Sequence, residues 1–235
     1  MGVDVITQGR QRARAGPWRG DPDVAYLAPA PNAPVPSPEF VRHCLDDLAR
    51  RGFRAVVTSA LAGAESSAFL AAGFDVHERL HVLEYDLKDL AAGAPEVPLR
   101  RALRRDRPAV LALDRRAFPP FWRLDDAGLD DAIGATPASR FRVAGGPDAV
   151  VGYAVSGRAG RQGYLQRLAV EPHQQRRGTG RALVLDGLRW MRRWGAEKAV
   201  VNTQQGNQPA LELYLALGFH LQPLGLSVLR YGTLV

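Results

Sequence analysis

Apolar and polar positions in the second half of the chain alternate in patterns typical of short strands and longer helices. Apolar runs bounded by turn residues predict strands at residues 97–102, 139–144, 149–156, 164–170, 199–202 and 227–231. Apolar residues at helical spacing predict helices at residues 106–118, 124–133, from Arg181 onward and at 209–217. Gly-Gly-Pro-Asp at residues 145–148 is typical of a tight turn, so the strands on either side of it are expected to pair as a hairpin.

The first part of the chain follows a similar but shorter pattern. Residues 1–20 are expected to form a short strand and then a mobile, arginine-rich arm, because little apolar pattern follows the first residues. After a brief strand at 24–27, the prolines of residues 29–38 predict an extended connector. Ser37 is predicted to cap a helix that ends at Gly52.

Two segments of the chain, Ala55–Tyr85 and Ala199–Tyr231, suggest an internal repeat. Each follows an apolar helix that ends in arginines and a glycine, and each contains a strand, a helix that ends in Gly-Phe, and a further strand. The alternative is two unrelated pieces that share only these helix ends, because short αβ segments look alike by chance. The repeat predicts that the two segments have the same fold and lie side by side.

Length and pattern predict two domains in the chain of 235 residues. We expect an N-terminal domain at residues 1–87, a linker at 88–96 and a second domain at 97–235. No apolar stretch approaches the length of a membrane span and the N-terminus has no apolar signal region, so a cytoplasmic protein without a membrane partner is expected. The single cysteine, Cys44, is expected in the core.

Charge and side-chain chemistry disfavour several classes of function. The formal net charge is +7, but the arginines are scattered over helices, loops and the N-terminal tail, so a nucleic-acid partner is not favoured. No group of His, Cys, Asp and Glu has the spacing of metal ligands, which predicts no metal site. A Ser-His-Asp hydrolase is disfavoured because no G-x-S-x-G elbow is present.

The most specific chemistry lies in the loop Gln175-Arg176-Arg177-Gly178-Thr179-Gly180, between a predicted strand and a predicted helix. The first N–H groups of a helix favour an anion, glycines allow the backbone to approach it, and arginines bind phosphate oxygens. The spacing fits neither G-x-x-x-x-G-K-[ST] nor G-x-G-x-x-G. The loop therefore indicates a phosphate site of another kind, with a solvated basic loop as the alternative.

The pattern Q-x-x-G-x-G after this strand resembles the acetyl-CoA loop of the GNAT N-acetyltransferases, which wraps the pyrophosphate of coenzyme A. Further family signatures follow: Asn202 ends a strand, Asn207 comes after it, and Tyr214 lies in a helix that ends in Gly-Phe. Residues 97–235 thus resemble a whole GNAT domain, an α/β (α+β) fold whose mixed, mostly antiparallel sheet is flanked by helices. Residues 1–87 resemble a degenerate, truncated GNAT-like half, because they lack the loop and a tyrosine equivalent to Tyr214.

The resemblance implies transfer of an acetyl group from acetyl-CoA to a primary amine by direct attack. It implies a coenzyme A site at Leu168, Ala169, Val170, Gln175, Arg176, Arg177, Gly178, Thr179, Gly180, Arg181, Asn207 and Tyr214. By similarity, the backbone of Leu168 and Val170 pairs with the pantetheine amides, and an N–H near Val170 faces the thioester carbonyl. Tyr214 is the expected proton donor to the leaving thiolate, and core packing is its alternative role. Asn207 is expected to bind pantetheine, to cap its helix, or both.

The general base is not specified. Enzymes of the RimI type carry a glutamate five positions before the asparagine, but here that position is Asn202, which cannot accept a proton at neutral pH. Asn202 is therefore a candidate catalytic residue that holds a water, as are Gln166 and Tyr164, and Glu84 is a candidate carboxylate. Residues 119–122 resemble the Phe-Pro-x-x-Trp segment of such enzymes, where the first helices form the acceptor wall; the alternative is an aromatic plug over the core.

Three hypotheses follow from these patterns. The first is an N-acetyltransferase that acts on an amine-bearing small molecule or protein, as a monomer with an internal pseudo-dimer or as a homodimer. The second is a non-catalytic module that binds acyl-CoA, which the missing glutamate motivates. The third is a basic nucleic-acid binder, for which affinity falls steeply with salt.

Overall fold

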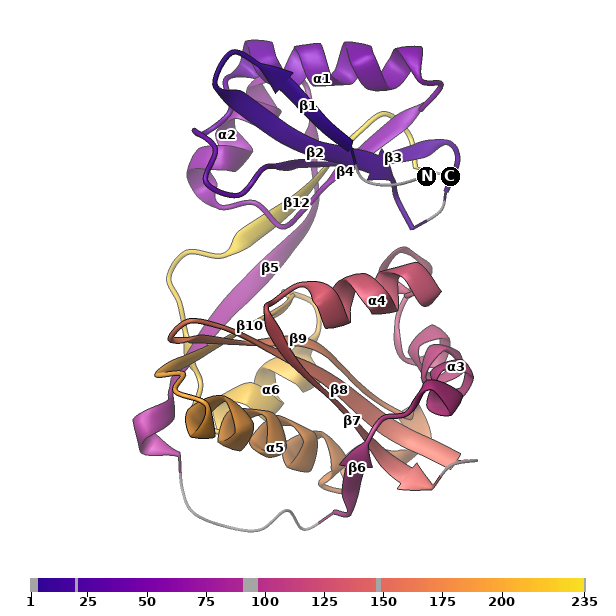
Figure 1. Cartoon of the computed structure of the whole chain (residues 1–235), viewed down its shortest axis with the longest axis vertical. Coiled ribbons are helices and arrows are strands. Elements are labelled where there is room, and N and C mark those ends of the chain that lie inside the picture. Colours follow the sequence, from indigo (N-terminus) through magenta and orange to yellow (C-terminus); the bar gives the residue numbers. More distant parts are fainter. Residues whose placement is uncertain (1–3, 20, 91–96, 147–148, 235) are drawn as a thin grey trace. The chain divides into compact units, whose positions relative to one another are not determined.

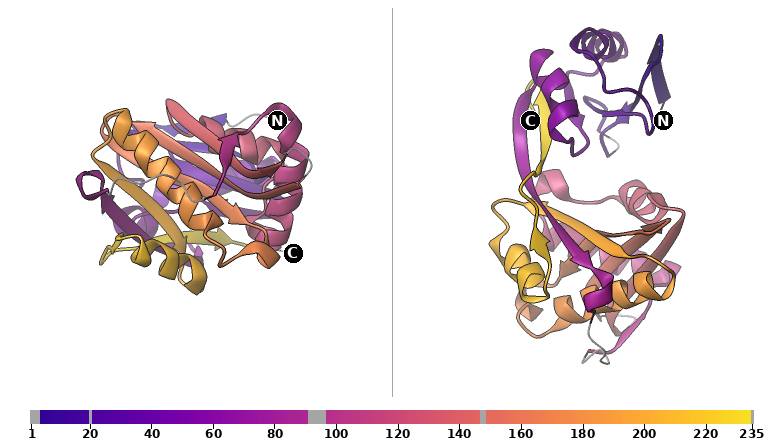
Figure 2. Two further views of the ribbon diagram at one scale, coloured as in Figure 1. Left: turned by 90° about the horizontal axis from the view of Figure 1, so that it is seen from below. Right: turned by 90° about the vertical axis from the view of Figure 1, so that its left-hand side faces the viewer.

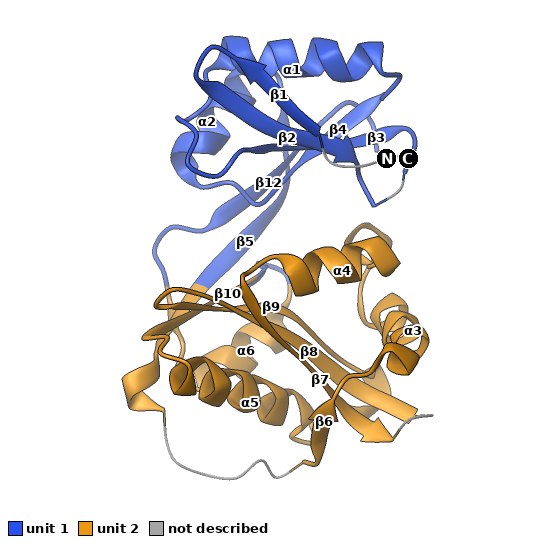
Figure 3. Ribbon diagram, in the orientation of Figure 1, with its two compact units in different colours: residues 1–82, 203–206, 222–235 blue, residues 83–202, 207–221 orange. Residues whose placement is uncertain are grey.

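A computed structural model describes residues 4–19, 21–90, 97–146 and 149–234 (Figure 1). The chain divides into two compact units (Figure 3). Unit 1 comprises Met1–Val82, Thr203–Gly206 and Gln222–Val235, and unit 2 comprises Leu83–Asn202 and Asn207–Leu221. The predicted domains at 1–87 and 97–235 are contiguous segments, whereas the compact units are interleaved along the chain. Within the described residues no helix is long and apolar enough to cross a membrane.

Unit 2 contains a mixed sheet in the order β5-β10-β9-β8-β7-β6. Its strands are β6 (Leu99–Arg101), β7 (Ala138–Gly146), β8 (Ala149–Ala159), β9 (Gln162–Val170), the start of β10 (Lys198–Gln204), the end of β5 (Asp75–Asp86) and β11 (His220–Leu221). Strands β6 to β9 pair antiparallel, and β10 is parallel to β9. Its helices are α3 (Arg107–Ala117), α4 (Asp126–Gly134), α5 (Thr179–Arg193) and α6 (Gln208–Ala216), with short 3-10 helices η1 (Leu87–Asp89), η2 (Arg104–Asp106), η3 (Pro120–Trp122) and η4 (Pro172–Gln174).

The helices of unit 2 cover the two faces of its sheet. One core joins α3 and α4 to the sheet through Val110, Leu113, Leu129 and Tyr153. A second core joins α5 and α6 to the other face through Val184, Leu188, Met191 and Tyr214. The ribbon views show helices on both sides of this sheet (Figure 2). The apolar spacing of these helices places such residues on one side, and burying that side against the sheet stabilises the helix.

Unit 1 is built on the strands β1 (Asp4–Gln8), β2 (Gln11–Pro17), β3 (Val24–Pro29), β4 (Ala55–Thr58), β12 (Leu226–Tyr231) and the start of β5, in the order β1-β2-β3-β4-β12-β5. Helices α1 (Pro38–Arg50) and α2 (Gly63–Ala71) pack into a single core that includes Phe40, Leu48, Phe69 and the predicted core residue Cys44. As predicted, Ser37 caps α1, since its Oγ accepts a hydrogen bond from the N–H of Phe40 at 3.2 Å.

The two halves of the chain exchange their last strands. In unit 1, β12 lies between β4 and the start of β5, and it pairs antiparallel with both. In unit 2, Glu84 and Leu83 of β5 pair with β11. Each half thus follows the order strand, helix and terminal strand: β12 ends the second half but lies in unit 1, and β5 ends the first half and extends from unit 1 into unit 2, which agrees with the predicted repeat.

Two expectations about local structure were wrong. The described part of residues 1–20 is an antiparallel hairpin of β1 and β2, with Ile6 and Ala13 in the core, and not a mobile arm. Asp106 does not cap α3 through its side chain; it is fully buried, and its carboxylate binds Arg100 through two bonds of 2.7 Å. The predicted linker and the turn at 145–148 fall partly outside the described residues, at 91–96 and 147–148.

Candidate coenzyme A site

The two parallel strands of unit 2 separate after a short paired stretch. Gln162–Tyr164 of β9 pairs with Lys198–Val200 of β10, and no further pairing joins these strands in the described part of the chain. The register between β8 and β9 shifts at the same level, from Ser156 opposite Leu165 to Val155 opposite Arg167. Gln166 is therefore an extra residue, a β-bulge, and bulges bend the strand that carries them. The bend accounts for the separation of β9 from β10.

This separation leaves part of the β9 backbone open. The N–H of Glu171 donates to Val151 O at 2.9 Å, so at this end of β9 alternate residues point their backbone groups toward β8. The N–H and C=O groups of Leu168 and Val170 consequently point to the side that β10 has left. Val170 O accepts a long hydrogen bond of 3.4 Å from Gln175 Nε2 on that side.

A cavity of about 600 Å³ lies along this open edge. It is bordered by the end of β9, the glycine loop, the start of α5 and one side of α6. The predicted residues that line it are Leu168, Ala169, Val170, Gln175, Arg176, Gly178, Gly180, Arg181 and Asn207. The structure thus brings together most of the predicted coenzyme A site.

The glycine loop borders this cavity at the start of α5. Arg176 and Gly178 have left-handed conformations, with φ of 62° and 81°. Gly178 precedes the first residue of α5. The first-turn N–H groups of any helix have no intrahelical acceptor, and here the N-cap residue has no side chain to accept from them either. Gly180 faces the cavity wall, where a Cβ would lie 3.3 Å from Leu213 Cδ2. These features suit an anion at the helix N-terminus.

Ion pairs beside the cavity differ in strength. Arg176 pairs with Glu212 at 3.2 Å, but the side chains are 78% and 48% exposed, so the pair contributes little to stability. Arg116 of α3 binds Glu171 at 2.6 Å, just after β9. Hydrogen bonds from Arg116 hold the pKa of Glu171 below its ordinary value. Glu171 is therefore ionised at neutral pH and joins the end of α3 to the start of the loop.

Some predicted cofactor residues lie outside the cavity lining. The Arg177 side chain is exposed to solvent. Thr179 is only 6% exposed, and its methyl group packs against Gly152 of β8, where a Cβ would approach it to 2.9 Å. Asn207 does line the cavity and also caps α6, because its Oδ1 accepts a hydrogen bond from Ala210 N at 3.3 Å.

The two predicted catalytic residues also lie outside the lining. Tyr214 is 4% exposed, and its ring centroid lies 5.4 Å from that of Phe219 in the core under α6. Burial raises the pKa of Tyr214, so its hydroxyl stays protonated at neutral pH. Asn202 is exposed on β10. Among the alternatives, Glu84 pairs with Lys198 at 3.3 Å, and Gln166 donates from Nε2 to Thr136 Oγ1 at 3.3 Å.

Other lining residues were not predicted from the sequence. On α6 they are Pro209, Ala210, Glu212, Leu213 and Ala216. Their helical spacing of three or four residues was a readable signal, because it places them on one face of α6. Ala117 and Phe118, at the end of α3, carried no such signal, since only tertiary packing brings them to β9. The described residues include no group of three His, Cys, Asp or Glu side chains that could hold a metal ion.

Comparison with known proteins agrees with this geometry. Residues 107–219 match the model of the acetyltransferase (GNAT) family. A mycothiol acetyltransferase of Thermobispora bispora is 31% identical over 143 residues, which cover 54% of this chain and 48% of that protein. One of Actinosynnema mirum is 32% identical over 145 residues, with the same coverage. The chain thus spans about half the length of the relatives it matches.

Solved structures extend the likeness to the whole chain. A tandem GNAT protein from the clavulanic acid biosynthesis pathway has a TM-score of 0.71 at 14% identity, covering 97% of this chain and 81% of that one. A GCN5-related N-acetyltransferase from Sphaerobacter thermophilus has a TM-score of 0.63 at 15% identity, covering 96% and 79%. At these identities the likeness concerns the fold alone. Residues 107–219 thus match the GNAT acetyltransferase family, and the chain as a whole has the fold of a tandem GNAT protein, with two GNAT-like halves.

Proposed function

We propose that unit 2 transfers an acetyl group from acetyl-CoA to a primary amine, on a small molecule or on a protein, by direct attack. The observation that carries this proposal is the cavity that joins an open strand edge to an uncapped helix N-terminus. An open strand edge suits the amides of pantetheine, and the helix N-terminus suits a pyrophosphate. Acetyl-CoA contains both groups.

The residues present fit this cofactor. First-turn N–H groups of α5, with Arg176 and Arg181, would hold the pyrophosphate. The open backbone groups of Leu168 and Val170 would pair with the pantetheine amides. When bound, acetyl-CoA supplies an acyl group activated as a thioester. A backbone N–H near Val170 would then donate to the thioester oxygen, where negative charge develops as the amine attacks.

Tyr214 is the proposed proton donor to the departing thiolate. Its O–H carries a proton that it can donate, and its neighbour Leu213 lines the cavity. Asn202 is the proposed holder of a water that accepts the proton of the amine, because its own amide is not basic. The first acceptors to screen are those of the mycothiol acetyltransferases, since two relatives carry that name.

Calorimetric titration of acetyl-CoA tests the proposal. Wild-type protein is expected to bind with a Kd on the order of micromolar, about −8 kcal/mol. Gly178→Glu is expected to weaken binding at least about a hundredfold, because a carboxylate at the helix start repels the pyrophosphate. Gly52→Glu is the matched control, since it places a glutamate at a glycine of unit 1 that is also left-handed, with φ of 96°, and where a Cβ meets nothing within 4 Å.

A folded wild-type protein that binds no acetyl-CoA would overturn the proposal, and so would a Gly178→Glu variant that binds as tightly as wild type. Circular dichroism and a thermal scan establish that each variant is folded before it is titrated.

A second candidate function is a module that binds acyl-CoA without transferring the acyl group. One observation favours it: neither Tyr214 nor Asn202 lines the cavity. Amine-dependent release of free coenzyme A, measured with a thiol reagent, separates the two candidates. Turnover above the rate of thioester hydrolysis excludes the non-catalytic module.

A further inference from the structure

A buried ion pair stands beside the cavity without forming part of its lining. Asp114 of α3 is fully buried, and Arg167 of β9 has a side chain that is 11% exposed. The Arg167 guanidinium donates to both Asp114 oxygens, from Nε at 2.9 Å and from its NH2 group at 2.7 and 2.9 Å. Such a two-pronged bond holds both side chains in one geometry.

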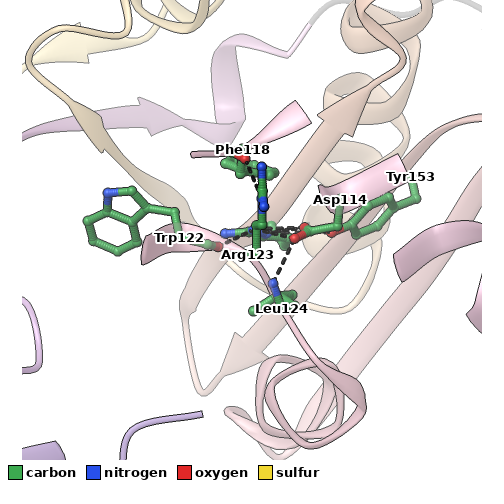
Figure 4. Close-up of polar contacts among 7 residues, drawn as sticks. Asp114, Phe118, Trp122, Arg123, Leu124 and Tyr153 are labelled. Atoms are coloured by element: carbon green, nitrogen blue, oxygen red, sulfur yellow. Dashed lines mark hydrogen bonds and ion pairs between the residues drawn. The ribbon is translucent and has the colours of Figure 1, made fainter. Parts of the chain in front are cut away.

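The remaining bonds of Asp114 complete its environment (Figure 4). The N–H of Leu124 donates to one carboxylate oxygen at 2.7 Å, and the hydroxyl of Tyr153 donates to the other. Burial raises the pKa of Tyr153, so its hydroxyl keeps the proton that it donates. These donors satisfy both oxygens of the buried carboxylate, so the cost of burying it is offset by hydrogen bonds.

Arg167 also fixes the segment that follows α3. Its NH2 group donates to Trp122 O at 2.6 Å, and its guanidinium carbon lies 3.5 Å from the centre of the Phe118 ring. The Phe118 backbone is held on both sides. Its N–H donates to the backbone carbonyl of Asp114 at 3.0 Å, and its own carbonyl accepts from Arg123 Nε at 3.1 Å. These two backbone bonds and the stacked guanidinium of Arg167 hold Phe118 against the end of β9.

That position lies in the cavity wall. Phe118 lines the cavity, and its ring stacks on the side chain that directly precedes Leu168, the first residue of β9 to reach the lining. The glycine loop lies at the other end, beyond Val170. With the pyrophosphate at the loop and pantetheine along Leu168–Val170, as proposed above, the acyl group would lie at the end of the cavity that Phe118 lines.

We infer that Phe118 forms the wall against which the acyl group packs and thereby limits acyl-chain length, and that Asp114 and Arg167 are positioning residues that hold this wall. The inference rests on the proposed function, since it concerns the same cavity. It assigns the preference for a short acyl group to one side chain and to the buried ion pair behind it.

The test measures Kd for acetyl-, butyryl- and hexanoyl-CoA by calorimetry. In wild type the hexanoyl thioester is expected to bind more weakly than the acetyl thioester. In Phe118→Ala the ratio of hexanoyl to acetyl Kd is expected to fall about tenfold or more, because admitting even one further methylene to an apolar pocket is worth about that factor. Phe121→Ala, a matched change in the same segment at a ring outside the cavity lining, is expected to leave the ratio unchanged.

Arg167→Lys tests the positioning role. Lysine keeps a positive charge beside Asp114 but lacks the planar fork that reaches Trp122 O and stacks on Phe118. The ratio of hexanoyl to acetyl Kd in Arg167→Lys is expected to lie between the ratios of wild type and Phe118→Ala. It is measured at a temperature where thermal scans show all variants folded. A role confined to stability would lower the unfolding temperature and leave the ratio at the wild-type value.

The outcomes separate this inference from the proposed function. If acetyl-CoA binds but Phe118→Ala keeps the wild-type ratio, or Phe121→Ala shifts it equally, the assignment of the wall is wrong and the acyl-CoA site stands. If Arg167→Lys leaves the ratio unchanged, the positioning role is wrong. If folded wild type binds none of the three thioesters, both proposals fail.

Discussion

The parallel strand pair of unit 1 stays together where the pair of unit 2 separates. Val24–Leu27 of β3 pairs with Ala55–Thr58, the whole length of β4, whereas β9 pairs with β10 only over its first residues. The described register of β3 against β2 is continuous, but β9 carries the bulge at Gln166. A single extra residue, Gln166, thus distinguishes the fully paired strands β3 and β4 from β9 and β10, which leave a backbone edge open.

The N-termini of the helices that follow β3 and β9 also differ between the units. In unit 1 the Ser37 side chain satisfies a first-turn N–H group of α1, whereas in unit 2 α5 begins after Gly178 with no side-chain cap. A capped terminus is stable by itself, and an uncapped one keeps its donors for a ligand. The comparison teaches that the same strand-helix-strand unit becomes either scaffold or binding site through one bulge and one cap.

The largest expected difference between the halves concerns their ion pairs. Asp114→Ala in unit 2 is expected to lower the free energy of unfolding by about 3–5 kcal/mol, because it leaves the buried Arg167 without its partner. Asp4→Ala in unit 1 removes an exposed partner of Arg51 and is expected to lower it by less than about 1 kcal/mol. Urea unfolding measures both, and equal losses would contradict this contrast.

Next in size is the loss of the proposed proton donor. Tyr214→Phe is expected to reduce amine-dependent turnover by about a hundredfold or more and to leave the affinity for acetyl-CoA nearly unchanged. Tyr231→Phe, at an exposed tyrosine of unit 1, serves as control. Unchanged turnover in Tyr214→Phe would leave Tyr214 only its packing role in the core under α6.

Filling the open edge tests whether the separation of the strands creates the site. Gly180→Leu is expected to weaken acetyl-CoA binding about tenfold or more, about 1.4 kcal/mol, since its side chain would occupy the space between Val170 and Leu213. Glu39→Leu changes the second residue of α1, the equivalent place in unit 1, where the side chain is 73% exposed. Calorimetry should show wild-type affinity for this control; a comparable loss there would count against the contrast.

The smallest effect is expected at the cap of unit 1. Ser37→Ala is expected to lower the free energy of unfolding by about 1 kcal/mol, because the N–H of Phe40 loses its acceptor. Ser67→Ala, an exposed position within α2, is the control. Denaturant titration of both variants decides the point, and a loss at Ser67 as large as that at Ser37 would show that the cap is not responsible.

Local patterns were sufficient to predict much of the fold. The helices around Phe40 and Leu188 and the strands of unit 2 follow from apolar spacing, because burial of one face depends on positions along the chain. The arm at residues 1–20 was misjudged since β2 alternates arginine with small residues such as Ala13 and Ala15, which carry little apolar signal yet fill a core beside α1.

The sequence by itself determined the resemblance to the GNAT family, the glycine loop and the order of elements, because these depend on residues close together in the chain. Only the tertiary structure decided where β9 leaves β10, which strand each half gives to the other, and that Phe118 rather than Tyr214 reaches the cavity. These features arise from strand register and from side chains that meet across long stretches of chain, such as Asp114 and Arg167. No local pattern encodes such meetings, since their stability comes from burial that exists only once the sheet and helices have assembled.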